Sequence, residues 1–181
     1  MEHLEEYLVD TCGLTGSQAL KASKKLSHLK SATKPDAVLA LLSVVGLYRA
    51  DLAAVVATEP RLLCARADSI TGRFASLRHI AGLSDPQIGS FLLAGGAVHF
   101  YSCDVSAKLA FWIQFLGSFE RLLKILKRNY SSLSSSLDKV SKPNIALLLR
   151  CGLSVCDIVT ISQNAAWVLT FNPVHCEHRC P

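Results

Sequence analysis

The chain has 181 residues, of which half are apolar and 18% are charged, a composition that excludes a wholly disordered protein and allows one domain with a sizeable core. Lysine and arginine outnumber aspartate and glutamate by 19 to 14, which weakly favours an anionic partner. No apolar run reaches the roughly 18 residues of a membrane-spanning helix, so no membrane partner is expected. The acidic start of the sequence resembles neither a secretory signal nor a transit peptide.

One short pattern occurs five times along the chain: a large side chain, a glycine five positions later, and an apolar residue six positions after that glycine. The steps between the glycines are 33, 36, 35 and 35 residues for Gly13, Gly46, Gly82, Gly117 and Gly152. The large side chains are Leu8, Leu41, Leu77, Trp112 and Leu147, and the later apolar residues are Ala19, Leu52, Ile88, Leu123 and Ile158. Such a period predicts an array of stacked units, with the large side chains buried at equivalent positions.

The second unit illustrates why each unit is expected to be a pair of helices. Pro35 fits a first helical turn, and apolar residues follow it at helical spacing. Gly46 supplies the left-handed conformation that ends this helix. A second helix is expected from Arg49 to Thr58, before Pro60, and Leu62 and Leu63 fall on a short turn.

The start of the second helix also recurs, as a hydroxyl residue three positions before an amide or carboxylate. This is the capping-box arrangement, and it is found at Thr15 and Gln18, Ser84 and Gln87, and Ser154 and Asp157. In the second unit Tyr48 replaces the hydroxyl residue, so only Asp51 remains to interact with the helix dipole. No sustained alternation or hairpin turn indicates β structure, so the fold class is predicted to be all-α.

Basic side chains form stripes on two of these helices. At about 100° per residue, one face about 120° wide holds Arg121, Lys124, Lys127 and Arg128. A similar stripe in the first unit holds Lys21, Lys24 and Lys25, followed by His28. Both stripes fit contacts with phosphate groups, and both also fit an ordinary solvated face.

Other residue groups give weaker indications. Seven cysteines lie at irregular spacing, most of them inside apolar helical patterns, which predicts small buried side chains and a reducing compartment. His175, Cys176, His178 and Cys180 match no structural zinc module, so neither a metal nor another cofactor is expected. No histidine is paired with a nucleophile in a glycine-framed site, and no catalytic residue is expected. Trp112 is expected to pack in the core, whereas Trp167 is open to either packing or base stacking.

The segment GLYRADLAAVVATEPRLL, residues 46–63, resembles the repeat of the mTERF family, the mitochondrial transcription termination factor-like proteins. Residues 7–31, 117–129 and 137–153 resemble segments of its plant branch, and the resemblance covers residues 5–173. It implies a superhelical solenoid of tandem helical mTERF repeats of about 33–36 residues. It further implies binding to double-stranded DNA or RNA and a role in transcription termination, transcription regulation or transcript processing in a mitochondrion or chloroplast.

The chain departs from the family pattern in three ways. The proline that ends a repeat, Pro60, is replaced by Gly96 and Ala166 in later units, a transit peptide is expected to be absent, and residues 174–181 form an unmatched polar tail. A C-terminally truncated array is therefore expected to expose an apolar end at residues 165–169 and to self-associate. The alternatives are a helical scaffold that binds protein or RNA and a truncated isoform without function.

Overall fold

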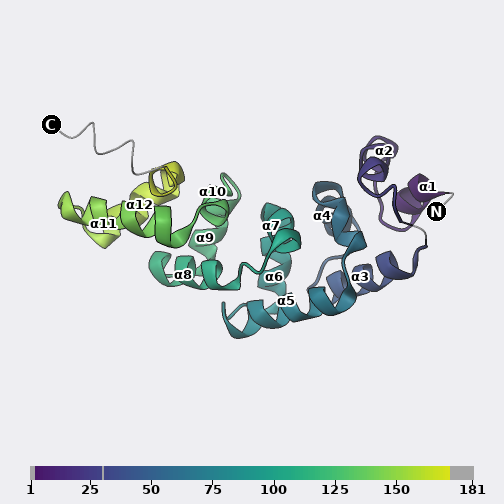
Figure 1. Ribbon diagram of the computed structural model, residues 1–181, viewed down its shortest axis with the longest axis horizontal. Coiled ribbons are helices and arrows are strands. Elements are labelled where there is room, and N and C mark those ends of the chain that lie inside the picture. Colours follow the sequence, from purple (N-terminus) through teal and green to yellow (C-terminus); the bar gives the residue numbers. More distant parts are fainter. Residues whose placement is uncertain (1–2, 30, 172–181) are drawn as a thin grey trace. The chain divides into compact units, whose positions relative to one another are not determined.

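The computed structural model describes residues 3–29 and 31–171 of the chain, and all of these lie in helices or in the turns that join them. The predicted all-α class is confirmed for this described part (Figure 1). The chain divides into two compact units, residues 1–106, called unit 1, and residues 107–181, called unit 2. The five cysteines in the described ranges are free, but the expectation that most of them are buried is wrong for this part of the chain: Cys12 is buried and Cys64 half-buried, whereas Cys103, Cys151 and Cys156 are exposed.

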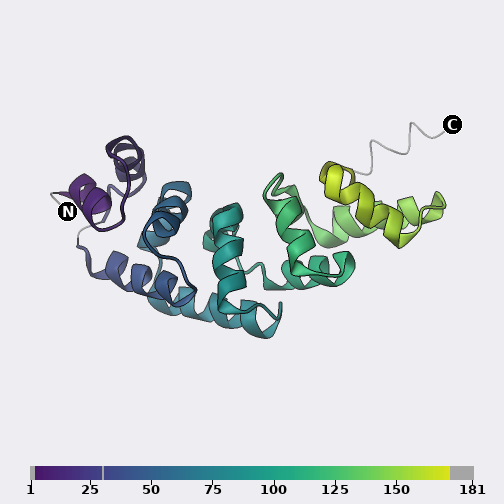
Figure 2. The same cartoon turned by 180° about the vertical axis from the view of Figure 1, so that it is seen from behind.

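Unit 1 is built from helices that pack against helices of the neighbouring repeats. Helix α2 contacts α4, α4 contacts α7, and α3 packs against α5 (Figures 1 and 2). The elements of unit 1 are α1 (Leu4–Asp10), α2 (Gly16–Lys25), α3 (Thr33–Val44), α4 (Ala50–Thr58), the 3-10 helix η1 (Pro60–Cys64), α5 (Ala67–His79), α6 (Asp85–Phe91), the π-helix η2 (Leu92–Gly96) and α7 (Ala97–Ser102).

Unit 2 is organised around α12, which packs against α9, α11 and the short helix η4. Helix η4 also contacts α10 and α11, so the last described turn is held from several sides. The elements are α8 (Ser106–Leu116), α9 (Phe119–Leu126), α10 (Ser131–Ser134), the π-helix η3 (Leu137–Ser141), α11 (Lys142–Arg150), α12 (Val155–Asn164) and the 3-10 helix η4 (Ala166–Leu169).

The five repeated glycines all adopt the left-handed backbone conformation that the sequence predicts for Gly46. Their φ angles lie between 67° and 89°, and each glycine lies between the two helices of its repeat. After Gly46, the Leu47 N–H donates to the Leu42 oxygen at 3.3 Å and the Leu47 side chain is buried. This 6→1 hydrogen bond is that of a Schellman motif, in which the helix ends and the following apolar residue packs back against it.

The three predicted capping boxes are all present. Thr15, Ser84 and Ser154 are the N-caps of α2, α6 and α12, and each is paired with the residue three positions later. Helix α4 has no side-chain cap, in agreement with a tyrosine, Tyr48, in place of the capping Ser or Thr, and its N-cap Arg49 has a φ of 47°. A fourth cap was not predicted: Ser118 accepts a hydrogen bond from the Arg121 N–H at the start of α9.

The prediction that the large repeat residues are equally buried is only partly correct. Leu8, Leu77 and Trp112 are at most 2% exposed, whereas Leu41 and Leu147 are half-buried. In α3 the neighbouring Leu42 takes the fully buried position, because that helix is rotated by about one residue relative to the expected register. The later apolar positions behave similarly: Ala19, Ile88 and Ile158 are buried, and Leu52 and Leu123 are half-buried.

The third and the fifth repeat, which lack the repeat proline, differ in how their second helices end. Pro60 begins η1 after α4, and Ala166 begins η4 after α12 in the same way. At Gly96 the helical path instead continues through η2 into α7, with a kink at Gly95, whose φ is 94°. A Cβ on Gly96 would lie 2.3 Å from a ring carbon of Phe91, so only glycine fits this passage without a shift.

Candidate nucleic-acid interface

Helix α9 separates an apolar face from a basic one. Leu122, Ile125 and Leu126 are buried, whereas Arg121 and Lys124 are on the opposite side. The predicted stripe continues past the helix, because α9 ends at Leu126 and Lys127 is its C-cap. The four cations Arg121, Lys124, Lys127 and Arg128 are called the α9 surface.

Both arginines of the α9 surface are anchored by backbone carbonyl groups. Arg121 Nη1 donates to the Leu116 oxygen at 3.0 Å, and Arg128 Nη1 donates to the Gln163 oxygen at 3.0 Å. A guanidinium has five N–H donors, so each side chain keeps donors for a further acceptor while its position is restricted. Such a fork matches the paired oxygens of a phosphate.

The two lysines of the α9 surface are less constrained. Within the described part of the chain, no hydrogen bond or ion pair to another residue is found for the amino group of Lys124 or of Lys127. Each therefore presents a hydrated point charge on a flexible stem. The α9 surface thus combines two positioned guanidinium groups with two mobile ammonium groups.

An open cleft of about 330 Å³ lies beside Arg121, between the end of α8, the start of α9 and α12. Thr160 and Gln163 of α12 supply polar groups to its wall, and Phe115 and Val159 supply apolar ones. Helix α12 packs on α9, so these groups belong to one face of unit 2. A cation beside a partly polar cleft is suited to an anionic ligand with an apolar portion.

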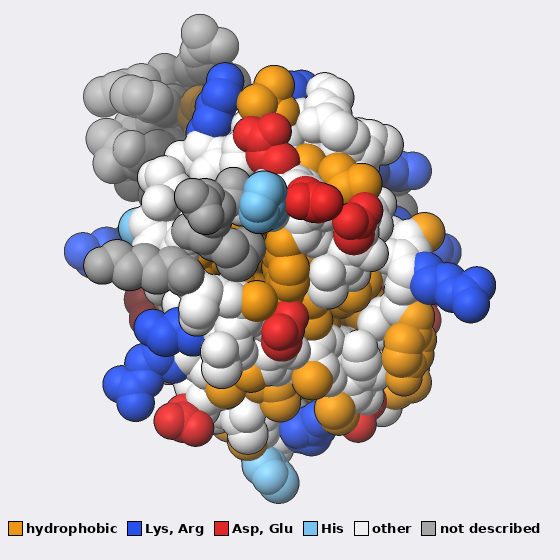
Figure 3. All heavy atoms as spheres, turned by 90° about the vertical axis from the view of Figure 1, so that its right-hand side faces the viewer, with side chains coloured by type: hydrophobic (Ala, Val, Ile, Leu, Met, Phe, Trp, Pro, Cys, Tyr) orange, Lys and Arg blue, Asp and Glu red, His pale blue; other side chains and the backbone are white. Residues whose placement is uncertain are grey.

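The second predicted stripe, in unit 1, has an acidic neighbour. Lys21, Lys24 and Lys25 lie on α2, and His28 lies beyond the end of that helix, contrary to the expected continuous stripe. Helix α1 packs on α2, and Ser23 Oγ donates to Glu5 Oε1 at 3.0 Å. Figure 3 shows acidic side chains gathered around a histidine on the end of unit 1 that carries α1. These carboxylates oppose the field of the α2 lysines.

Several other cations of unit 1 are paired with carboxylates. Arg61 and Glu59 are 2.7 Å apart, as are Arg78 and Asp85. Arg73 instead donates to the backbone oxygens of Phe100 and Tyr101. These side chains serve the packing of unit 1 and offer little free positive charge.

The net charge of the two units differs. Residues 107–181 contain nine lysines and arginines against four acidic residues, whereas residues 1–106 contain ten of each. The whole excess of positive charge therefore belongs to unit 2. This signal is present in the sequence, but the boundary at residue 106 that reveals it comes from the packing.

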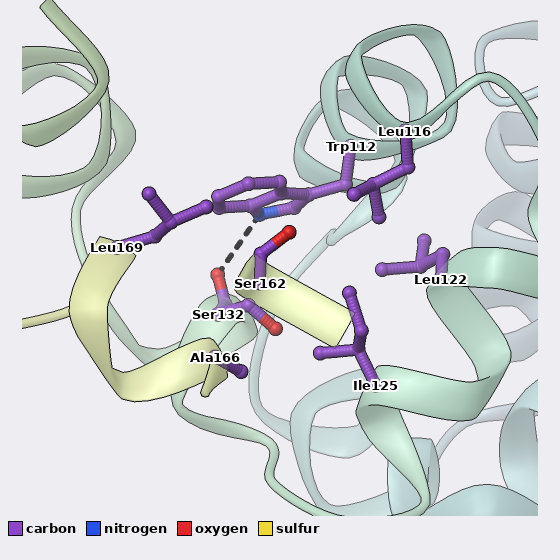
Figure 4. Close-up of a pocket in the computed structure, with 8 residues that line it drawn as sticks. All are labelled: Trp112, Leu116, Leu122, Ile125, Ser132, Ser162, Ala166 and Leu169. Atoms are coloured by element: carbon purple, nitrogen blue, oxygen red, sulfur yellow. Dashed lines mark hydrogen bonds between the residues drawn. The ribbon is translucent and has the colours of Figure 1, made fainter. Parts of the chain in front are cut away.

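The two tryptophans have different environments. Trp112 is 2% exposed, and its Nε1 donates to the Ser132 oxygen at 3.1 Å across a small apolar cavity (Figure 4). The expected core position of Trp112 is confirmed. For Trp167 the sequence is compatible with both base stacking and core packing, and the side chain is 60% exposed.

Three further expectations concern the C-terminal tail, a membrane span and an apolar C-terminal end. His175, Cys176, His178 and Cys180 and the tail 174–181 lie outside the described residues. Within residues 3–29 and 31–171, no helix combines the length and the apolar character that a bilayer span requires. Of the residues expected to form an apolar C-terminal end, Trp167 is exposed but Leu169 is buried.

No protein-family model matches the sequence, and a search of curated proteins gave no match.

Proposed function

We propose that this protein is a nucleic-acid-binding regulator of organellar gene expression, built as a solenoid of mTERF-type repeats. The observation that carries the proposal is the concentration of excess positive charge in unit 2, where four cations form the α9 surface. The five helix pairs with left-handed glycines support the repeat interpretation. The ligand is double-stranded DNA or RNA, held by its phosphates, and the compartment is a mitochondrion or chloroplast.

The physical basis of binding is the neutralisation of phosphates. Each phosphate that a lysine or arginine contacts releases condensed counterions, so affinity depends steeply on salt concentration. Arg121 and Arg128 are already oriented by their carbonyl partners and lose less side-chain entropy on binding than free side chains do. Lys124 and Lys127 can follow the phosphate backbone without fixing a sequence.

This mode of action requires no covalent chemistry. A protein bound to a template or transcript acts by occupying it, which is the basis of transcription termination, regulation of transcription and transcript processing in this proposal. Phosphate contacts carry no information about the bases, so any contacts that select a sequence must lie outside the α9 surface.

A protein-binding scaffold is the second candidate, and unit 1 favours it. That unit has no net charge, and Val44, Tyr48 and Ile80 are each more than half exposed close to the repeat glycines Gly46 and Gly82. Exposed apolar groups of this kind are common in protein-binding faces. Under this alternative, the α9 cations are solubilising and do not bind a ligand.

The test is fluorescence anisotropy with labelled duplex DNA and RNA, at about 50 mM and about 200 mM salt. The double variant Lys124→Gln/Lys127→Gln is expected to weaken binding to both ligands and to reduce the salt slope by about 2, or about one for each phosphate that is no longer neutralised. The matched control is Lys21→Gln/Lys24→Gln, which removes two lysines from the neutral unit.

Equal reductions of affinity in the two double variants would show that the charge difference between the units has no bearing on binding. Binding to neither nucleic acid at the lower salt concentration would exclude the proposed function and favour the scaffold.

A further inference from the structure

The end of unit 2 carries an exposed pair of aromatic rings. Trp167 in η4 is 60% exposed and Phe171 is 45% exposed, and their ring centroids are 6.4 Å apart in an edge-to-face arrangement. Most large aromatic side chains are largely buried on folding, because each contributes a large apolar area. The ring of Trp167, the more exposed of the two, therefore suggests a ligand.

The backbone beneath these rings is held by buried groups. Leu169, two residues after Trp167, is 2% exposed and lines the small cavity opposite Trp112 (Figure 4). Asn144 of α11 is 4% exposed, and its Nδ2 donates to the Phe171 oxygen at 2.7 Å. The two rings thus project from an anchored turn, which lowers the entropy lost when a flat ligand binds.

A cation of the α9 surface is attached close to the same turn. Arg128 donates to the Gln163 oxygen in the last turn of α12, and Trp167 follows Gln163 by four residues. Helix α12 ends at Asn164, and η4, which carries Trp167, begins at Ala166 after a non-helical Ala165. The segment from Gln163 to Trp167 therefore combines an anchored guanidinium with an open aromatic ring.

We propose that Trp167, with Phe171 beside it, is a stacking site for an unpaired base of a single-stranded nucleic acid whose phosphates lie along the α9 surface. This inference deepens the proposed function and depends on it. A single strand offers free base faces to aromatic rings, whereas the bases of a duplex are already stacked on one another. The aromatic pair therefore selects single-stranded segments, while the α9 cations bind any phosphate backbone.

Tryptophan fluorescence tests this site directly, because the chain has only two tryptophans. Trp112 is buried and hydrogen-bonded, so its emission is expected to stay constant, whereas the exposed Trp167 is open to quenching by a stacked base. The full chain is titrated with oligo(dT), oligo(U) and a duplex of equal length, and binding is followed in parallel by anisotropy. Single strands are expected to quench the emission, and the duplex is not.

Variants separate stacking from general affinity. Trp167→Ala is expected to weaken single-strand binding by about fivefold or more and to leave duplex binding unchanged. Trp167→Phe is expected to keep the affinity and lose the quenching. Tyr48→Ala is the matched control, because Tyr48 is an aromatic residue of similar exposure, 62%, in the neutral unit, and its removal is expected to change neither signal.

Single strands that bind without quenching, and with equal affinity to Trp167→Ala, would overturn the stacking site and leave the phosphate-binding function intact. An emission shift that depends on protein concentration in the absence of nucleic acid would also overturn it, by assigning the ring pair to a second copy of the chain. The absence of any binding would exclude the proposed function itself.

Discussion

Gly89 in α6 approaches the backbone of Val45, at the end of α3, so closely that a Cβ on Gly89 would lie 2.4 Å from the Val45 oxygen. The atom in the way belongs to the backbone, which cannot swing aside as the end of a long side chain could. The contact joins the second repeat to the third, since α3 precedes Gly46 and α6 follows Gly82. Glycine at this position therefore sets how closely two units of the repeat can pack.

Gly89→Ala is expected to destabilise the protein by about 1–3 kcal/mol, the usual cost of overpacking, because α6 must move away from Val45. Gly72→Ala is the matched control. Gly72 lies inside α5, and a Cβ there meets no atom within 4 Å, so the change is expected to be neutral or to stabilise by up to about 1 kcal/mol. Urea denaturation of both variants checks this, and equal midpoints would contradict the close approach.

Leu77→Ala is expected to cost about 2–5 kcal/mol, the range for a buried large-to-small change, because Leu77 is 1% exposed. Leu41→Ala, at the equivalent position of the second repeat, is expected to destabilise the protein less, because Leu41 is only half-buried. The measurement is the change in urea midpoint. A larger loss for Leu41→Ala would mean that the different burial of the two repeat positions does not decide their contributions to stability.

The features that the sequence predicted well are local ones. A positive φ at Gly46, the boxes at Thr15 and Ser84, and the helix end before Pro60 depend on residues within one turn of each other. The burial of Leu41 and Leu147 depends instead on how each helix is rotated against its neighbours, and a one-residue rotation changes it. Helical periodicity fixes a face to within about one residue and cannot resolve that difference.

The candidate site was predictable in part for the same reason. The α9 stripe follows from helical spacing, and its separation from the buried face agrees with the sequence, but the carbonyl partners of Arg121 and Arg128 could not be read from it. Gln163 is 35 positions from Arg128, and no local pattern pairs them. The exposure of Trp167 likewise depends on the short helix η4, which follows α12 in the fifth repeat. At the matching place in the third repeat, the helical path instead continues through Gly96 into α7.

Ser154→Ala is expected to destabilise the protein by about 1 kcal/mol, because the N-cap of α12 is removed. Ser154 Oγ accepts from the Asp157 N–H at 3.2 Å, and the Asp157 carboxylate accepts from the Ser154 N–H at 2.9 Å. Thr71→Ala is the control, since Thr71 is an exposed residue inside α5 and alanine there favours the helix. In thermal denaturation, the midpoint is expected to fall for Ser154→Ala and not for Thr71→Ala. Equal midpoints for the two variants would show that the cap contributes nothing.

Glu59 makes stability depend on pH in the acidic range. Its side chain is 2% exposed, and its oxygens accept from Arg61 Nε at 2.8 Å and from Arg61 Nη2 at 2.7 Å. Burial alone raises the pKa of Glu59, but the hydrogen bonds from the Arg61 side chain and backbone outweigh it and hold the pKa below its ordinary value. A lowered pKa in the folded state means that the unfolded chain takes up the proton first.

The stabilisation from Glu59 is therefore present above the ordinary glutamate pKa, about 4.3, and is lost as the pH falls through the lower value in the folded protein. Glu59→Gln is expected to lower the free energy of unfolding near pH 7 and to flatten its decrease between about pH 5 and about pH 3. Asp68→Asn is the control, because Asp68 is 91% exposed and its contact with Arg66 is 3.7 Å long. Urea denaturation across this range measures both, and a Glu59→Gln curve parallel to that of the unmodified protein would show that Arg61 does not hold the folded carboxylate in its charged form.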